Sequence, residues 1–147
     1  MKTISVSVTP VAKQRPRGYK TKNGKIGFYT PSSNKEFEYI IRKQAEKVFE
    51  KPLTTPVSLT IFFYMPRPKR LIWKTKPMPS HPCDKRPDID NLIKSVTDGL
   101  NGIAYLDDGQ ISSIHAYKRY HAGDGRPKTV IKIEKDEMKE EEKKWES

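Results

Sequence analysis

Five aspartates gather between Pro87 and Gln110, in the stretch PDIDNLIKSVTDGLNGIAYLDDGQ, although the chain of 147 residues carries a formal net charge of +11. The acids are Asp88, Asp90, Asp98, Asp107 and Asp108, and the only basic residue among them is Lys94. Two carboxylates held about 4 Å apart repel by roughly 1 kcal/mol in water and by several times more in a drier cleft. The cluster therefore needs solvation, hydrogen bonding or a bound cation.

Convergence of several of these acids on one point would create a site for a metal ion. Asp88 and Asp90 lie where an extended segment enters a predicted helix, and Asp107 and Asp108 lie on the turn that follows it. The two pairs can meet if the segment between helix and turn doubles back, which the sequence permits. Oxygen ligands alone favour Mg²⁺, with Mn²⁺ as the alternative. Taken singly, each acid is better explained as a helix cap, a surface residue or a turn residue.

Lys94 follows Asp90 by four residues, so both side chains are expected on one face of the same helix. An ion pair at this spacing contributes about 0.2–0.5 kcal/mol, and that is the structural explanation. Beside a carboxylate cluster, the ammonium group can instead neutralise a phosphate oxygen while a phosphodiester bond breaks, or help to orient the attacking water. We favour this second role for Lys94.

The sequence does not match the motifs of three other kinds of site. Counted from Asp88, an EF-hand calcium loop would need glycine and glutamate where Ile93 and Gly99 stand. His81 and Cys83 have no second pair of ligands at zinc-binding spacing. No phosphate-binding GxxxxGK(S/T) loop is present, so no nucleotide cofactor is expected.

The positive charge is clustered, which predicts a polyanionic partner. The chain has 29 Lys and Arg residues against 18 Asp and Glu, and residues 11–25 contain no acid. Residues 66–86 contain seven basic residues and one acid, Asp84. Clustered cations bind phosphate backbones and release counterions, so DNA is the expected partner. The predicted DNA contacts are Lys13, Arg15, Arg17, Lys20, Lys69, Arg70, Lys74, Lys76, Lys85 and Arg86.

The periodicity of apolar residues predicts the elements that position these side chains. Ser33 and Glu36 have the spacing of a capping box, which would start the first helix. The strand that begins at Val57 is apolar on both faces, as a central strand would be. The predicted elements are strands over 4–8 and 26–30, a helix over 33–49, a strand over 57–65, a helix over 89–100, and strands over 111–120 and 128–134.

This order predicts a small mixed β-sheet with two main helices, an α/β or α+β fold. We expect one domain over residues 1–134 and a charged C-terminal tail over 135–147. No apolar run approaches the roughly 20 residues that span a bilayer, and the N-terminus lacks the apolar core of a signal peptide. The single cysteine, Cys83, suits a reducing compartment. A cytoplasmic protein without a membrane partner is expected.

The acidic stretch resembles the signature of the RusA family of Holliday-junction endodeoxyribonucleases. That signature is roughly PDxDNxxKxxxDxL followed by a DD-x-Q turn, which here reads PDIDNLIKSVTDGL and DDGQ. The segments KQRPR at Lys13–Arg17 and FYTP at Phe28–Pro31 also resemble those of family members. The resemblance spans about residues 4–134.

The resemblance implies roles for the residues that match the signature. The family's essential carboxylates fall on Asp88, Asp90 and Asp108, and its important lysine falls on Lys94, so these are the expected catalytic residues. The same three acids, with Asp107 beside them, are the expected metal ligands. The family implies an α/β homodimer that resolves four-way DNA junctions in recombination and repair, nicking two strands symmetrically with Mg²⁺ or Mn²⁺. A four-way junction with two-fold symmetry can be cleaved by two identical active sites that are related by the same two-fold axis.

Two other functions stay open at this point. The first is another metal-dependent DNA nuclease, of the PD-(D/E)xK kind. Pro87-Asp88 would be one half of its motif, and either Glu137-Met138-Lys139 or Glu141–Lys144 in the charged tail would be the other. The second is a non-catalytic basic DNA-binding protein that is accessory to recombination. Its aspartates would only cap helices and form turns. The long basic segment Pro66–Pro87 and the acidic tail after Glu134 depart from the family pattern, so the preferred cleavage sequence stays open.

Overall fold

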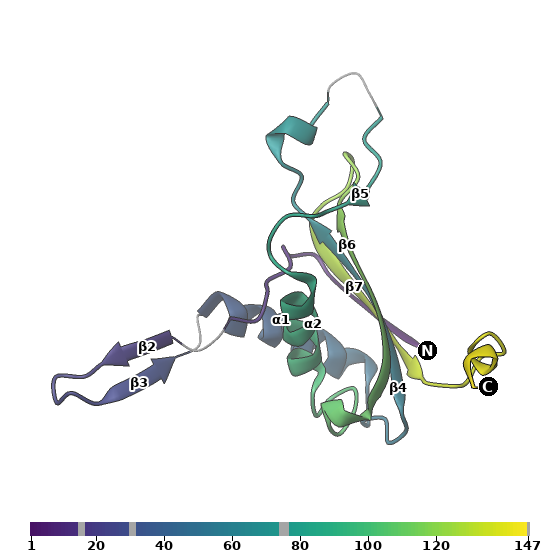
Figure 1. Cartoon of the computed structure of the whole chain (residues 1–147), viewed down its shortest axis with the longest axis horizontal. Helices are drawn as coiled ribbons and strands as arrows, with labels where there is room; N and C mark the ends of the chain where they lie inside the picture. The colour runs from purple at the N-terminus through teal and green to yellow at the C-terminus, as the bar shows by residue number, and fades with distance from the viewer. Residues whose placement is uncertain (15–16, 30–31, 74–76, 147) are drawn as a thin grey trace.

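The structure, a computed structural model, describes residues 1–14, 17–29, 32–73 and 77–146. Its main sheet has five strands in the order β1-β7-β4-β6-β5, and both long helices lie on one face of it (Figure 1). This confirms the predicted mixed sheet with two helices. The strands of the sheet are β1 (Lys2–Val6), β4 (Val57–Met65), β5 (His81–Pro82), β6 (Ile111–Tyr120) and β7 (Lys128–Lys135).

The centre of the sheet is the strand that the sequence predicts to be buried on both sides. β4 runs parallel to β6 and antiparallel to β7, while β1–β7 and β5–β6 are antiparallel pairs. Along β4, alternate residues from Val57 to Phe63 have no exposed surface. They form the core together with the apolar sides of the two helices. The intervening residues lie on the opposite face and are only partly buried.

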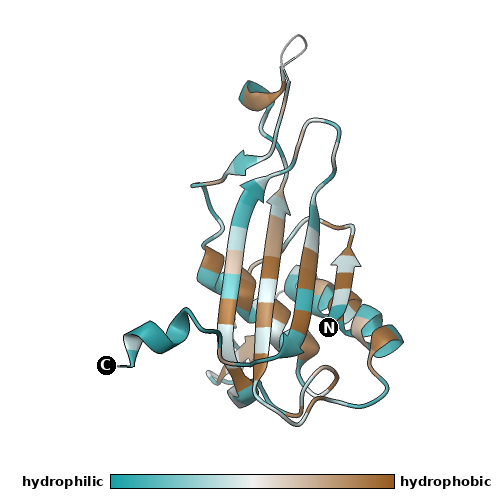
Figure 2. Cartoon of the chain, turned by 90° about the vertical axis from the view of Figure 1, so that its right-hand side faces the viewer, coloured by the Kyte–Doolittle hydropathy of each residue, from teal (hydrophilic) through white to brown (hydrophobic). Residues whose placement is uncertain are grey.

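Neither of the two long helices covers that opposite face of the sheet (Figure 2). Phe62 stacks on Tyr117 of the neighbouring strand, with ring centroids 4.8 Å apart and planes 14° apart. Arg119 and Lys128 place their cations 5.3 Å and 5.4 Å from the ring centroids of Tyr117 and Tyr64. Aromatic stacking and cation–π contacts therefore hold together the central side chains of the open face.

The helices α1 (Ser32–Val48) and α2 (Ile89–Leu100) pack on each other over a glycine. A Cβ atom at Gly99 of α2 would lie 3.1 Å from Cβ of Ile41 in α1, so the helices meet closely because this side chain is missing. Near the start of α1, the buried Asn34 amide donates to the Ser95 hydroxyl over 3.1 Å. The two helices therefore contact each other through apolar side chains and through one buried hydrogen bond.

Two segments extend away from the sheet and the helices. β2 (Arg17–Lys20) and β3 (Ile26–Tyr29) form a separate antiparallel hairpin that projects from the body of the molecule (Figure 1). Gly24 has a φ of 77° in its turn, which favours glycine at that position. Within its described residues, the basic segment after β4 is a long loop with the short helix η1 (Lys69–Leu71) and β5 as its regular elements.

The predicted elements agree with the structure except at some ends. β1 ends at Val6, because the chain leaves the sheet before Val8. The first helix already begins at Ser32, so Ser33 lies inside its first turn and the predicted capping box does not start it. The tail contains the short helix η3 (Glu142–Trp145). Within the described residues, the helices are too short or too polar to span a bilayer.

Candidate active site

The chain doubles back after α2 and brings the second aspartate pair beside the helix. Gly102 has a φ of 81°, and its N–H donates to the Tyr105 carbonyl over 2.9 Å, which closes a tight loop. The Tyr105 hydroxyl then donates to the Thr97 carbonyl of α2 over 2.7 Å. Burial raises the pKa of Tyr105, and the negative charges of the neighbouring aspartates raise it further. The phenol therefore stays neutral and keeps the returning segment against the helix.

The aspartate pair itself lies at the short helix η2 (Asp108–Gln110), whose position Gln110 fixes. The side-chain oxygen of Gln110 accepts from the N–H groups of Leu106 and Asp107 over 2.8 Å and 3.0 Å. Its amide nitrogen donates to the carbonyl oxygens of Leu53 and Thr55 over 2.8 Å and 3.1 Å. A single glutamine thus satisfies four backbone groups and joins the turn to the segment before β4. The signature contains this glutamine, but its spacing gives no indication of this role.

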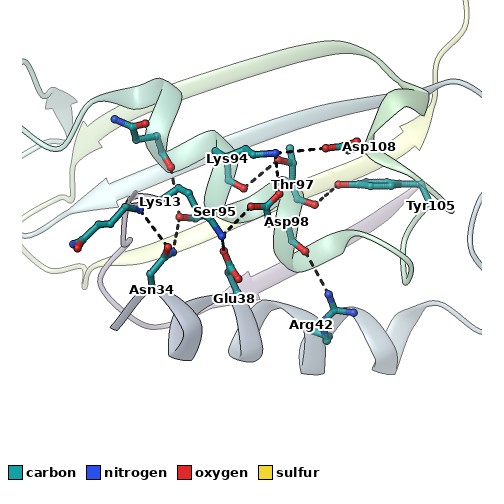
Figure 3. A network of polar contacts seen from close by, with 12 residues as sticks. Lys13, Asn34, Glu38, Arg42, Lys94, Ser95, Thr97, Asp98, Tyr105 and Asp108 are labelled. Atoms are coloured by element: carbon teal, nitrogen blue, oxygen red, sulfur yellow. Dashed lines mark hydrogen bonds and ion pairs between the residues drawn. The ribbon is translucent and has the colours of Figure 1, made fainter. Parts of the chain in front are cut away.

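The two aspartates of the pair differ in what their side chains do. The Asp107 carboxylate accepts from the Gly109 N–H over 3.0 Å and caps η2. Asp108 instead points toward α2, where its Oδ2 lies 3.6 Å from the Lys94 Nζ (Figure 3). Local hydrogen bonding therefore occupies Asp107 and leaves Asp108 directed at the helix.

Asp108 and one face of α2 enclose a shallow pocket of about 300 Å³. Its lining residues are Asp90, Ile93, Lys94, Thr97, Asp108, Ile111 and Ile114. Three of the four expected catalytic residues therefore meet in one place, Asp90 and Lys94 from the helix and Asp108 from the turn. Ile111 and Ile114 of β6 form an apolar wall of the pocket, which is open to solvent.

Lys94 forms ion pairs with Asp98 and Asp108. Its Nζ lies 3.0 Å from Oδ1 of Asp98, one turn further along α2, and 3.6 Å from Asp108. Among the described residues no ion pair joins it to Asp90, although both side chains line the pocket. A hydrogen bond to Asp98 and the charge of that acid raise the pKa of Lys94, and Asp108 adds to the effect. Lys94 is therefore a permanent cation rather than a proton acceptor.

Asp98 also connects the pocket to the first helix through a second lysine. Lys13 Nζ lies 3.1 Å from Asp98 Oδ2 and 2.7 Å from Glu38 Oε1 of α1 (Figure 3). Burial tends to lower the pKa of Lys13, but its hydrogen bonds to Glu38 and Asp98 outweigh burial and raise it. The sequence predicts that Lys13 binds DNA. Its cation is engaged by two internal acids, which favours a role in holding Asp98.

Asp88 lies at the start of α2, outside the lining of the pocket. It occupies the N-cap position, yet its side chain makes no capping hydrogen bond. Lys118 of β6 donates to the Pro87 carbonyl over 2.8 Å and also binds the Lys85 carbonyl, which fixes the segment just before it. Over the described part of the chain, no three acidic, His or Cys side chains lie close enough together to form a metal cluster.

The predicted DNA contacts are distributed over the hairpin and the long loop. Lys20, on the projecting hairpin, is exposed, and so are Lys69, Arg70, Lys85 and Arg86 on the loop. Arg17 belongs to β2, but only its backbone is described. Arg15, Lys74 and Lys76 lie outside the described residues. The exposed cations thus belong to two segments that extend from the body of the molecule.

Comparison with known proteins identifies relatives over most of the chain. The sequence model of a family described as Endodeoxyribonuclease RusA matches residues 7–134. The chain is 35% identical over 118 residues to an uncharacterized protein, YqaN, of Bacillus subtilis strain 168, which covers 76% of this chain and 82% of that protein. It is 30% identical over 109 residues to the crossover junction endodeoxyribonuclease rusA of Lactococcus phage r1t, with coverage of 71% and 77%.

Proposed function

The chain belongs to the RusA family of endodeoxyribonucleases, and on that premise we propose that it resolves four-way DNA junctions by metal-dependent cleavage of the phosphodiester backbone. One observation carries the proposal: Asp90, Lys94 and Asp108 line one open pocket. Two carboxylates and a cation in a shallow, accessible hollow suit an extended phosphodiester strand. In the PD-(D/E)xK alternative, Glu137 and Lys139 would act from an exposed tail after β7, so it has less support.

The donor chemistry of the pocket fits Mg²⁺, with Mn²⁺ as the alternative. Mg²⁺ is usually held by one or two carboxylates together with waters and substrate phosphates, rather than by an all-protein cage. Asp90 and Asp108 would supply those carboxylates. Asp88, whose carboxylate caps nothing, is the acid available to complete the set at the start of the helix. A bound divalent ion would lower the pKa of a water and stabilise negative charge on the phosphate.

Lys94 is the residue of the pocket that acts directly on the DNA backbone. Lys94, kept protonated by Asp98, places a fixed positive charge where the phosphate gains negative charge during cleavage. Asp98 and Lys13 position Lys94 without touching the strand.

The whole enzyme is proposed to act in the cytoplasm, in DNA recombination and repair, as a homodimer. Two symmetric nicks in a four-way junction require two equivalent pockets related by a two-fold axis. The exposed cations of the hairpin and the long loop would contact the junction arms, because clustered Lys and Arg residues bind phosphate backbones.

A cleavage assay with the parent and Asp90→Asn tests this proposal. Labelled four-way junctions and linear duplexes of the same sequence are incubated with Mg²⁺ or with EDTA, and junction binding is measured in parallel. We expect the parent to nick the junction symmetrically only with Mg²⁺, and Asp90→Asn to bind but not to cleave. Equal cutting of the linear duplex would favour a general nuclease. Binding without cleavage by the parent under any metal condition would favour an accessory protein.

A further inference from the structure

A second hollow, of about 420 Å³, lies at the end of the sheet where β4 and β6 finish. Four basic residues line it, together with Tyr120 and Cys83: Arg67, Arg70, Lys85 and Arg86. No acidic residue is among the described residues that line it. Like charges concentrated around one hollow repel each other, so the arrangement favours an anion between them.

Arg67 gives the strongest indication that an anion belongs there. The residue is only 8% exposed, yet the described part of the chain provides it with no acidic partner. Its Nε and Nη1 donate to three neutral carbonyl oxygens, those of Leu71, Pro79 and His121, over 2.7–3.0 Å. Its Nη2 is buried and has no hydrogen-bond partner among the described residues. A buried guanidinium without a counter-ion is costly, and an anion in the hollow would offset that cost.

The hollow is also held in shape by contacts that do not depend on a ligand. The same three bonds from Arg67 join the outgoing arm of the long loop to its returning arm and to the end of β6. The Cys83 N–H donates to the Lys118 carbonyl over 3.1 Å, and the Cys83 thiol donates to the Lys85 carbonyl over 3.9 Å. The Lys118 side chain binds the backbone around Lys85. The two basic arms are therefore fixed on either side of one cavity.

The hollow lies next to the proposed active site along the chain. Arg86 belongs to its lining, and Asp88 at the start of α2 follows two residues later. A DNA strand that approaches Asp88 and Asp90 meets their negative charge. A site that neutralises another phosphate of the same strand would hold the strand against that repulsion.

We propose that this hollow binds a phosphate of the DNA backbone beside the phosphate that is cleaved. The inference rests on the proposed function and adds to it a binding site built by the long loop. The exposed guanidinium group of Arg70 provides a planar pair of donors that matches phosphate oxygens. The buried Arg67 adds its positive charge to the wall of the hollow, and Lys85 and Arg86 add charge from the other arm.

Binding of a fluorescent four-way junction in EDTA, over a series of KCl concentrations, tests the proposal. The triple variant Arg70→Ala/Lys85→Ala/Arg86→Ala leaves the buried Arg67 in place. The control, Lys47→Ala/Lys51→Ala/Lys135→Ala, removes the same charge from a hollow at the opposite end of the sheet. We expect the first variant to bind at least tenfold more weakly, with a salt dependence shallower by about 0.9 for each phosphate that the protein no longer neutralises. The control should change far less.

A small anion provides a second readout that does not depend on DNA. In NMR spectra of the ¹⁵N-labelled protein, added inorganic pyrophosphate should shift the backbone amide signals of Cys83 and Tyr120 in the parent and not in the loop variant. Equal loss of junction binding in both triple variants, or parent-like binding by the loop variant, would overturn the proposal. A parent that binds through the hollow but never cleaves would contradict the proposed function and leave this site standing.

Discussion

Lys94 combines exposure with a fixed charge, which defines its part in the proposed reaction. Its side chain is 52% exposed and reaches the solvent in the pocket, while Asp98 holds its ammonium group at 3.0 Å. Because its pKa is raised above 10.5, its ion pairs contribute to stability below pH 10.5 and lose that contribution as the pH rises through the folded-state pKa. At neutral pH the group is fully charged and can act on a phosphate only as a cation.

Replacement of Lys94 should therefore affect cleavage more than binding. We expect Lys94→Met to lower the single-turnover cleavage rate on the order of 10²–10³-fold, because it removes a donor directed at developing charge. Lys94→Arg should recover part of the rate, and the parent should show no loss of activity between pH 7 and 9 from this group. Rapid-quench kinetics across pH would measure these effects. Recovery of the rate by a neutral side chain would contradict the electrostatic role.

We expect the same substitution at the neighbouring residues Asp107 and Asp108 to have different effects on cleavage. Asp108→Asn should lower cleavage by on the order of 10²–10³-fold without lowering the melting temperature, because its carboxylate lines the pocket. Asp107→Asn should remain active, since an asparagine oxygen can still accept from the Gly109 N–H. Comparison of cleavage rates and thermal melts separates the two. Equal loss of activity in both variants would contradict the assignment of Asp108.

The ion pair between Asp98 and Lys94 is a contact that the sequence alone does not predict. The spacing of Asp98 from Lys94 permits an ion pair, but Asp90 lies at the same spacing on the other side. Position along a helix cannot distinguish them. Residues distant in the sequence determine which acid pairs with Lys94. Lys13 forms a second ion pair with Asp98, and the turn brings Asp108 close to Lys94. Such contacts depend on tertiary structure, which the local pattern does not contain.

At the scale of elements, periodicity is sufficient for the helices and strands but not for their pairing. It predicts β4 and α2 within a residue or two, because their apolar residues recur at the strand and helix periods. The parallel alignment of β4 with β6, and the insertion of β7 between β1 and β4, arise from packing between distant segments. Of the hairpin β2–β3, the sequence predicts only the second strand, because β2 (RGYK) shows no apolar alternation.

The close approach of α1 and α2 gives a prediction at this scale. A methyl group at position 99 would lie 3.1 Å from Ile41 and 3.2 Å from the Glu38 carbonyl oxygen, so Gly99→Ala should force the helices apart. We expect it to lower the free energy of unfolding by about 1–3 kcal/mol, and to lower cleavage because Glu38 and Asp98 face each other across this contact. Chemical denaturation would measure this, with the exposed Lys35→Ala as the control. A parent-like stability would show that the helices can shift without cost.

At the scale of the whole molecule, the distribution of charge matters more than its sum. The hairpin and the long loop carry exposed cations away from the body, such as Lys20 and Lys85, while two acids of the signature, Asp90 and Asp108, line one pocket of the body. Composition predicts a polyanionic partner. It cannot predict that Lys13 turns inward to two acids, because that depends on how the first segment packs against α1 and α2.

A dimer is the assembly that symmetric cleavage requires, and its mass can be measured. Each chain has a mass of 17.0 kDa, so light scattering after gel filtration should give twice that value at concentrations where the junction is cleaved. We expect dilution that dissociates the dimer to abolish paired nicks before it abolishes binding. Full activity of a species with the mass of one chain would contradict the two-fold arrangement.

The most direct test of the central claim is the position of the metal in crystals of the protein with a four-way junction and Mn²⁺. Anomalous scattering at the manganese edge locates the ion independently of the surrounding protein. We predict a peak within coordination distance of the carboxylates of Asp90 and Asp108, beside a phosphate of the junction, and none in Asp90→Asn crystals. A peak elsewhere in a preparation that cleaves junctions, with Asp90 and Asp108 away from the ion, would contradict the claim.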